Sequence, residues 1–435
     1  MDRARRWWGG LLPVTKGIAV ALVLNVVVVN AVLLALPGGS VGSTTAGETF
    51  DLVTLRATDG DSWFPMLRAY EHLEHRDDAG EQGLDAYESS RRRGELFIYP
   101  LTALLPVEVL HSKGALDATG LLAFGAIAVA VAWLLVDSVR EHGQPGRGEV
   151  RLLALLGLGA TACFYPVVKG VTLGQAQTWL TAAFAWSLVL WRRQRDTGPG
   201  VLAGLAALVK PQIALLLVWG VLRRHPRYAI AGLVAGAVGG LAALALWGTH
   251  ENLAYAAVLR DVGNRGSVYQ ANQSVNGFLN RLVGNGDSLV FDPTGFAATN
   301  SVVRIGTLVS SAALLVAALA YRRRAAGAGR VTDFLLIGLT VTIASPIAWE
   351  HHYGVLLPIY AVLVPALAAR PVLARWTVPV LAASYLLTSN HVAATDRLAG
   401  GPLSFLQSYL LFGAALVLVL LYRLRRAEAT EPSMP

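Results

Sequence analysis

The sequence predicts an all-α protein that crosses a membrane many times. Hydrophobic residues make up 54% of its 435 residues and charged residues only 15%, with a mean hydropathy of +0.51. Soluble domains carry roughly 25% charged residues, so this composition excludes an ordinary soluble fold. Apolar runs recur at about the 20-residue length that spans a bilayer. Lys and Arg cluster beside these runs, so the formal net charge of +8 indicates the positive-inside pattern and no nucleic-acid partner.

The first apolar run, residues 17–36, follows the basic segment 3–16. It is longer than a signal-peptide core and lacks a convincing cleavage site, which predicts an uncleaved first span. The basic segment places the N-terminus in the cytoplasm, so the polar loop 37–95 is expected outside. Within this loop, the charged stretches 71–78 and 91–93 predict helices that lie on the membrane surface.

The remaining apolar runs bring the expectation to about ten full spans and two partial ones, in a single transmembrane domain at 1–426. Both termini are expected in the cytoplasm, and a second polar loop, 248–300, outside. Residues 427–435 are expected to form a disordered cytoplasmic tail. The run 96–110 is short and marked by proline, which predicts a half-inserted or re-entrant segment. After the first span, the full spans are expected at 115–136, 152–171, 176–191, 230–247, 302–320, 334–347, 355–369, 378–387 and 403–422.

The apolar run 201–222 predicts the second partial span. Arg195 precedes it and Arg223 follows it, so both ends favour the cytoplasm. A single straight span would hold Lys210 near the bilayer centre, at a cost of about 2.5 kcal/mol or more. Two half-helices that fold back at Pro211 remove this conflict and present Lys210 at the apex of a hairpin. The alternative is a kinked span in which the lysine side chain snorkels to the surface.

The stretch ATDGDSWFPMLRAY places two carboxylates, Asp59 and Asp61, in the first outer loop. Acidic pairs in such loops are most often solvated surface or helix caps. Here, however, Gln175, the Asn272 region and the pair His351–His352 all fall at the outer ends of predicted spans. One extracytoplasmic pocket would unite these polar groups, and one Asp would then serve as a catalytic base.

Five further motifs follow the acidic one: FIYPLTALLP, LGQAQ, LVKPQ, ANQSVNGFLNRL and SPIAWEHHYG. Their types and order resemble glycosyltransferase family 87, a membrane family of the GT-C superfamily that includes polyprenyl-phosphate-mannose-dependent α-mannosyltransferases of actinobacteria. The resemblance runs from about Asp59 to Tyr353. The usual Tyr-Pro-Pro of the family is Tyr99-Pro100-Leu101 here, and its acidic motif more often has a single Asp. Both Asp59 and Asp61 therefore remain candidates for the base, with Asp61 favoured by its spacing to Arg68.

The resemblance implies a GT-C-type fold and an inverting transfer of a sugar, mannose in the first instance. The donor would be a polyprenyl-phosphate sugar, and the acceptor a glycolipid or lipoglycan outside a bacterial plasma membrane. Asp61 or Asp59 would take the acceptor proton. Cations would stabilise the leaving phosphate, with Lys210, His351, His352 and Arg281 as candidates. Sugar and acceptor contacts are expected from Gln175, Asn272, Gln273, Asn276, Trp63, Tyr99, Trp349 and Glu350.

No cofactor is predicted. Asp59-Gly60-Asp61 has the form of a metal-binding Asp-x-Asp motif, but a lipid monophosphate donor does not require a divalent cation, so no metal ligand is assigned. Adjacent helical residues point about 100° apart, so only one of His351 and His352 is expected to be functional. The alternative function is a non-catalytic lipid or glycan transporter, which would also have broken helices and a lysine at mid-membrane. A transporter would have little need of the acidic pair.

Overall fold

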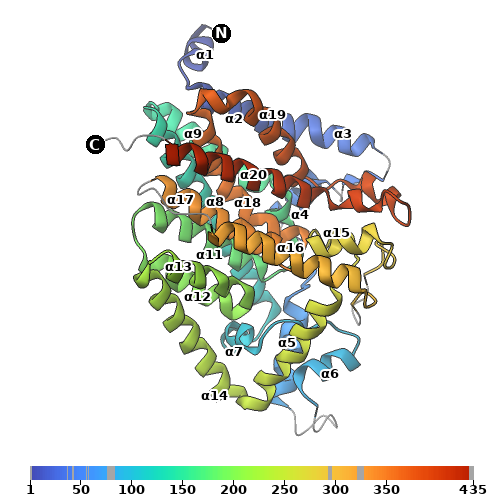
Figure 1. The fold of residues 1–435 in the computed structure, drawn as a ribbon. Coiled ribbons are helices and arrows are strands. Elements are labelled where there is room, and N and C mark those ends of the chain that lie inside the picture. Colours follow the sequence, from blue (N-terminus) through green and yellow to red (C-terminus); the bar gives the residue numbers. More distant parts are fainter. Residues whose placement is uncertain are drawn as a thin grey trace.

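The computed structural model of the chain is built from helices (Figure 1). It describes residues 2–36, 38–41, 44–54, 56, 58–75, 84–291, 296–320 and 328–430. Within these residues, the backbone pairing outside the helices includes one isolated antiparallel bridge, between Asn272 and Trp349. The prediction of an all-α architecture is therefore confirmed.

The first apolar run forms a nearly continuous helix over Pro13–Ala35. It consists of α2 (Pro13–Val23), the π-helical turn η1 (Leu24–Val29) and α3 (Asn30–Ala35), and it follows the short α1 (Asp2–Gly9). Asn25 is buried within it, and its Oδ1 accepts a hydrogen bond of 2.8 Å from Asn390 Nδ2. A polar pair of this kind fixes the contact between two helical segments in an apolar environment. The loop that follows contains α4 (Thr45–Val53), α5 (Trp63–Glu74) and α6 (Ala86–Arg92).

The predicted surface helices of this loop are shifted in part. The stretch 91–93 lies at the end of α6. The stretch 71–78 overlaps only the end of α5, which begins at Trp63 and therefore contains the aromatic part of the acidic motif. Residues 76–78 lie outside the described residues.

Six described helices are long and apolar enough to cross a membrane, and a seventh is added if a bent pair counts as one span. The bent pair joins α9 (Arg147–Ala162) and α10 (Tyr165–Thr172) at an angle of 55°. The structure thus supports a polytopic membrane protein but not a count of ten full spans. Three predicted spans correspond to helices that are not among these six, α11 (Gln177–Arg192), α17 (Ala328–Ile343) and α19 (Pro371–Thr388). The other long helices are α8 (Lys113–His142), α14 (Pro226–Arg265), α16 (Ser301–Ala320), α18 (Leu356–Ala368) with η5 (Glu350–Val355), and α20 (Tyr409–Thr430) with η7 (Ser404–Ser408).

The hairpin predicted at Lys210 is present. Helix α12 (Thr197–Val209) ends there, Lys210 itself is extended (φ −134°, ψ 100°), and η4 (Pro211–Ala214) and α13 (Leu215–Leu222) follow. The two ends of the hairpin meet again, because His225 Nδ1 lies 3.8 Å from Asp196 Oδ2. The other predicted partial span, 96–110, contains η3 (Leu101–Leu104) and α7 (Leu105–Leu110), both too short for a full span.

Helix α14 packs closely on α12 and then bends at Gly248, which has a φ of 75° (Figure 1). The close packing depends on glycine. A Cβ at Gly200 would lie 2.1 Å from the carbonyl oxygen of Tyr228, and one at Gly204 would lie 2.2 Å from that of Gly232. The part of α14 beyond the bend is a helix inside the predicted outer loop 248–300, which also contains α15 (Val275–Leu282).

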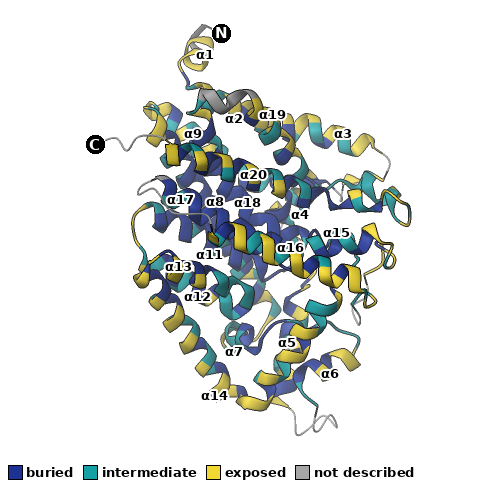
Figure 2. Cartoon of the chain, in the orientation of Figure 1, coloured by how far each residue is buried: buried dark blue, intermediate teal, exposed yellow. Residues whose placement is uncertain are grey.

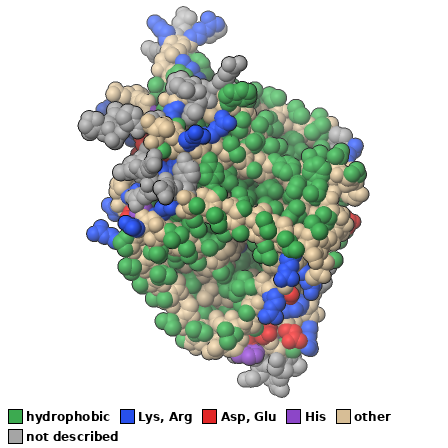
Figure 3. All heavy atoms as spheres, in the orientation of Figure 1, with side chains coloured by type: hydrophobic (Ala, Val, Ile, Leu, Met, Phe, Trp, Pro, Cys, Tyr) green, Lys and Arg blue, Asp and Glu red, His purple; other side chains and the backbone are tan. Residues whose placement is uncertain are grey.

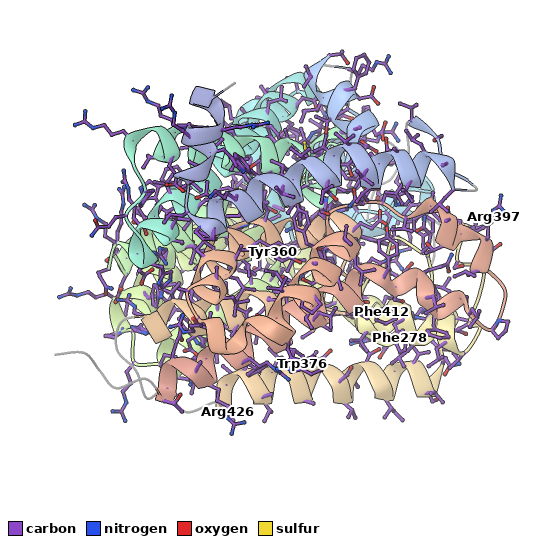
Figure 4. All side chains as sticks on the ribbon, turned by 90° about the horizontal axis from the view of Figure 1, so that it is seen from above. Phe278, Tyr360, Trp376, Arg397, Phe412 and Arg426 are labelled. Carbon is purple, nitrogen blue, oxygen red and sulfur yellow. The ribbon has the colours of Figure 1, made fainter. Side chains whose placement is uncertain are left out.

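Ion pairs mark one end of the helix bundle. Arg192, at the end of α11, contacts Asp137 near the end of α8 at 2.7 Å. Arg223, after α13, contacts Asp333 near the start of α17 at 2.7 Å. Arg426, near the end of α20, lies far from Arg397, which is in η6 (Ala393–Leu398) at the other end of the molecule (Figure 4). We call the end marked by these pairs the basic end.

The interior and the surface follow the pattern of a membrane bundle. Helices α11 and α18 are largely buried, whereas α14 and α16 expose many residues (Figure 2). Hydrophobic side chains dominate the middle of the face seen in Figure 3, with charged side chains toward its edges. Phe278 of α15 and Phe412 of α20 pack edge to face at 5.9 Å between the outer helices (Figure 4). Helix α20 continues to Thr430, so residues 427–430 of the expected disordered tail are helical.

Candidate active site

A cavity of about 890 Å³ lies at the end of the bundle opposite the basic end. Its wall is assembled from segments far apart in sequence: the loop before α5, the turn between α10 and α11, the loop before α15, and η5. We call it the main cavity. Seven of the predicted site residues line it: Asp59, Asp61, Tyr99, Gln175, Trp349, Glu350 and His351.

The acidic motif is fixed by a short ladder of backbone hydrogen bonds. The amide of Asp59 donates to Thr172 O at 3.1 Å, and that of Asp61 donates to Leu173 O at 2.8 Å. The two backbone segments approach each other so closely that position 174 requires glycine. Gly174 has a φ of 67°, and a Cβ there would lie 2.9 Å from the Cα of Gly60. The ladder therefore anchors the two carboxylates to the turn before α11.

Asp61 is the better placed of the two carboxylates for proton transfer. Its Oδ2 accepts a hydrogen bond from Gln175 Nε2. Burial raises the pKa of Asp61 and the charge of Asp59 raises it further, whereas the Gln175 hydrogen bond and the charge of Lys169 oppose this change. A carboxylate with a raised pKa is a stronger base than a solvated one, which suits an acceptor of the proton of a hydroxyl group.

Gln175 orients Asp61. Its Oε1 accepts hydrogen bonds from Ser62 Oγ at 2.8 Å and from Tyr99 Oη at 3.3 Å, so its NH₂ group is left for the carboxylate. The hydroxyl groups thereby fix the direction of the amide. Gln175 and Tyr99, predicted to contact sugar, lie in the cavity wall as supports of Asp61.

The two adjacent histidines face different cavities. His351 lines the main cavity, and its buried Nε2 has no hydrogen-bond partner among the described residues. His352 lines a smaller cavity of about 70 Å³ together with Lys210. Lys210 Nζ lies 2.5 Å from His352 Nε2 and donates to Gln177 Oε1 at 2.8 Å. The planes of the two imidazole rings are inclined at 79° to each other, as expected for neighbours that point in different directions.

Several residues of the main cavity were not selected from the sequence. Lys169 Nζ lies 2.7 Å from Glu48 Oε1, and Thr172 Oγ1 donates to Glu48 Oε2 at 2.5 Å. Lys169 stands inside a predicted span, and an ionisable residue in such a run is a signal of function that could have identified it. No comparable signal marks the others, which are Glu48, Arg68, Tyr165, Tyr269 and His391.

Glu350 lies in a buried network rather than free in the cavity. Its carboxylate accepts hydrogen bonds from Tyr165 Oη at 3.2 Å and Tyr409 Oη at 3.0 Å. His391 Nδ1 lies 3.2 Å from the same carboxylate and forms an ion pair with it when protonated. The sugar contact expected of Glu350 therefore competes with three protein partners.

Arg281 does not line either cavity. Its guanidinium is buried and donates to the carbonyl oxygens of Val268, Tyr269 and Asn272 at 2.9 to 3.1 Å, and to Ser408 Oγ at 2.7 Å. These bonds hold the loop before α15 against the start of α20. The guanidinium thus has protein partners in this structure, and its contact with phosphate stays a prediction.

The amides of the motif that contains Arg281 also bind protein groups in this structure, and their contacts with sugar stay a prediction. Asn272 Oδ1 accepts from the amide of Ala348 at 3.1 Å, and Asn276 Oδ1 accepts from the amide of Ser267 at 3.2 Å. Gln273 Nε2 donates to Gln407 O at 2.7 Å. Trp63 is likewise buried, and its ring packs on Trp179 at 4.9 Å. The sequence identified a polar segment, but its side chains bind the backbone of the cavity wall.

Among the described residues, no group of three or more His, Cys, Asp or Glu side chains is placed to hold a metal ion. The model of glycosyltransferase family 87 matches residues 97–346 of this chain. No curated protein and no solved structure matches it. The matched segment contains Lys169, Gln175 and Lys210, whereas Asp61 precedes it.

Proposed function

The chain belongs to glycosyltransferase family 87 and is a membrane glycosyltransferase, and we propose that it transfers mannose from a polyprenyl-phosphate donor to a glycolipid or lipoglycan acceptor. The observation that carries this proposal is Asp61, a carboxylate that is oriented by Gln175, lines a cavity of about 890 Å³ and has a pKa raised by desolvation. A cavity of this size can hold a sugar and the groups on either side of it.

The proposed reaction is a single inverting displacement. The acceptor hydroxyl oxygen attacks C1 of the sugar, and the bond from C1 to the phosphate oxygen breaks. Asp61 takes the proton of the hydroxyl group, a role that contributes about 10²- to 10⁴-fold to the rate. Asp59 lies in the same wall, and its charge contributes to the raised pKa of Asp61. We assign the base to Asp61 because Gln175 orients it.

The leaving phosphate needs positive charge or hydrogen-bond donors. In the main cavity these are supplied by Lys169 and His351, whose Nε2 has no partner among the described residues. Lys210 and His352 lie behind this wall in the smaller cavity, out of direct contact with the main cavity. The phosphate site that was predicted around Lys210 is thus proposed to centre on His351 and Lys169 instead.

The proposed location of the site is the extracytoplasmic side of a bacterial plasma membrane. The cavity lies at the end opposite Arg192 and Arg223, and arginine clusters favour the cytoplasm. The N-terminal segment lies with the basic end, since the amide of Leu12 donates to Glu149 Oε1 at 2.8 Å near the start of α9. Both termini are therefore proposed to be cytoplasmic.

We expect Asp61→Asn to lower transfer by at least about 100-fold, because the amide cannot accept the hydroxyl proton. The assay is the transfer of labelled mannose from polyprenyl-phosphate mannose to lipid in membranes that contain the full chain. Asp59→Asn should retain more activity than Asp61→Asn. Asp51→Asn is the matched control, because Asp51 pairs with Arg56 outside the cavity lining. Full transfer by Asp61→Asn would refute the proposed mechanism, and movement of lipid without transfer would favour a transporter.

A further inference from the structure

His391 occupies a defined position in the wall of the main cavity. It follows α19, in the turn that begins at Ser389, and its ring packs on that of Tyr165 at 5.3 Å. Nδ1 lies 3.2 Å from Glu350 Oε1 and 3.3 Å from Tyr409 Oη. His391 is therefore held on two sides while it lines the cavity.

The contacts of the ring determine which nitrogen faces the cavity. Among the described residues, the hydrogen-bond partners of His391 lie at Nδ1. The imidazole is planar, with Nε2 on the far edge from Nδ1. A histidine whose Nδ1–H is bound to a carboxylate presents Nε2 in a fixed direction. The protonated ring has an Nε2–H to donate to a group inside the cavity.

Glu350 favours the protonated form of this ring. A buried carboxylate is stable as an anion only when cations or donors compensate its charge. Glu350 has two hydroxyl donors, Tyr165 and Tyr409, and forms its ion pair with His391. Burial lowers the pKa of His391, but the charge and hydrogen bond of Glu350 raise it more, so the net change is upward.

Two further charged groups act on the same ring. Asp396, in η6, raises the pKa of His391, and Lys169, in α10, lowers it. Tyr165 and Tyr409 also contact the ring, and both are hydroxyl donors to Glu350. The carboxylates dominate this environment, which favours a cationic imidazole at the cavity wall.

We propose that His391, oriented by Glu350, is a catalytic residue that gives its Nε2 proton to the phosphate oxygen departing from the sugar. This rests on the proposed function. A lone pair of the acceptor oxygen forms the new bond to C1, and Asp61 takes its proton. The electron pair of the broken bond stays on the phosphate oxygen, which receives the proton of His391. The products are the glycoside and a polyprenyl hydrogen phosphate, and one proton passes through solvent from Asp61 to His391 to restore the enzyme.

The test compares the full-length wild type with His391→Gln in initial-rate assays of mannose transfer from pH 5.5 to 9. Because the acid must be protonated, kcat of the wild type should fall as the pH rises through the raised pKa of His391. His391→Gln should lower kcat by about 100-fold, lose this basic limb and leave KM for the donor nearly unchanged. Glu350→Gln removes the charge that raises this pKa, so its basic limb should move to lower pH.

Two controls separate a catalytic role from a structural one. His250→Gln makes the same substitution in a second His–Glu pair, where His250 Nδ1 lies 3.7 Å from Glu251 Oε1 and the side chain is 82% exposed. It should keep the rate and pH profile of the wild type. Binding of polyprenyl phosphate at pH 6 gives a readout besides activity: His391→Gln should bind about tenfold more weakly than the wild type, and a folded variant should still bind at pH 8.5.

An unchanged kcat in His391→Gln, or a reduced kcat with the basic limb intact, would overturn the role of His391 while leaving the proposed function in place. Absence of transfer by the wild type with polyprenyl-phosphate sugars would overturn the proposed function and, with it, the proton donation by His391. The binding of polyprenyl phosphate by wild type and His391→Gln would then still report whether the His391 ring contacts a bound phosphate.

Discussion

At the residue scale, the reactivity of the site depends on how Gln175 holds Asp61. The amide of Gln175 is directed by two hydroxyl groups, Ser62 and Tyr99, and donates to the carboxylate. Two influences on the pKa of Asp61 oppose each other: desolvation raises it and the hydrogen bond of Gln175 lowers it, and desolvation is the larger. The pH dependence of the enzyme should therefore respond to the amide.

Gln175→Leu should move the acidic limb of kcat/KM to higher pH. Asp61 must be ionised to act as a base, so activity is present above its pKa and is lost as the pH falls through it. The hydrogen bond of Gln175 lowers this pKa, so its removal raises the pKa further. The measurement is kcat/KM for transfer between pH 4.5 and 8.

The matched control for this pH profile is Gln212→Leu, since Gln212 lines only the smaller cavity. A profile of Gln175→Leu that coincides with that of the wild type would show that the amide does not act on the base.

At the element scale, the hairpin of α12 and α13 and its packing on α14 position Lys210. The helices approach so closely that a Cβ added at Gly200 or Gly204 of α12 would collide with a backbone carbonyl oxygen of α14. Close approach of backbones is a common basis of helix association in membranes, where small residues permit extensive van der Waals contact. The hairpin should thus tolerate little added volume on this face.

Gly204→Val should destabilise the protein by about 1 to 3 kcal/mol, since a Cβ at this position would lie 2.2 Å from the carbonyl oxygen of Gly232. The measurement is thermal unfolding in detergent, with transfer activity recorded in parallel.

Gly240→Val is the matched control, because no atom lies within 4 Å of a Cβ added to Gly240 of α14. Equal melting temperatures of the two variants would contradict the proposed packing of α12 on α14.

At the scale of the whole molecule, two ends of different chemistry are separated by the length of the bundle. Arginine ion pairs tie the helix ends together at the basic end, while acidic and histidine side chains meet around the main cavity at the other. An arginine-rich end of this kind favours one orientation of the chain in the membrane.

The proposed orientation predicts opposite labelling of two introduced cysteines. The single cysteine of the chain, Cys163, is first replaced by serine. Asp287→Cys, in the exposed loop after α15, should react with a membrane-impermeant maleimide in intact cells. Arg224→Cys, at the exposed turn after α13, should react only after the membrane is opened. Labelling of both positions, or of Arg224→Cys alone, in intact cells would contradict an extracytoplasmic site.

The sequence alone was sufficient for features that depend on local pattern. Apolar runs predicted the first span and the helical class, and the two arginine clusters around residues 201–222 predicted the break at Lys210. The order of the motifs predicted the family. Three runs that counted as full spans, 176–191, 334–347 and 378–387, correspond to helices that are not among the six long apolar ones. These runs hold fewer than the about 20 apolar residues that a straight crossing needs.

The partners of the polar side chains were decided only by the tertiary structure. Arg281 and Asn272 were expected in the pocket, yet they bind the backbone of its wall. Lys169 and His391 were not selected, yet both line the cavity. The physical reason is that a residue type fixes what a side chain can bind, whereas the packing of segments hundreds of residues apart fixes which group it meets.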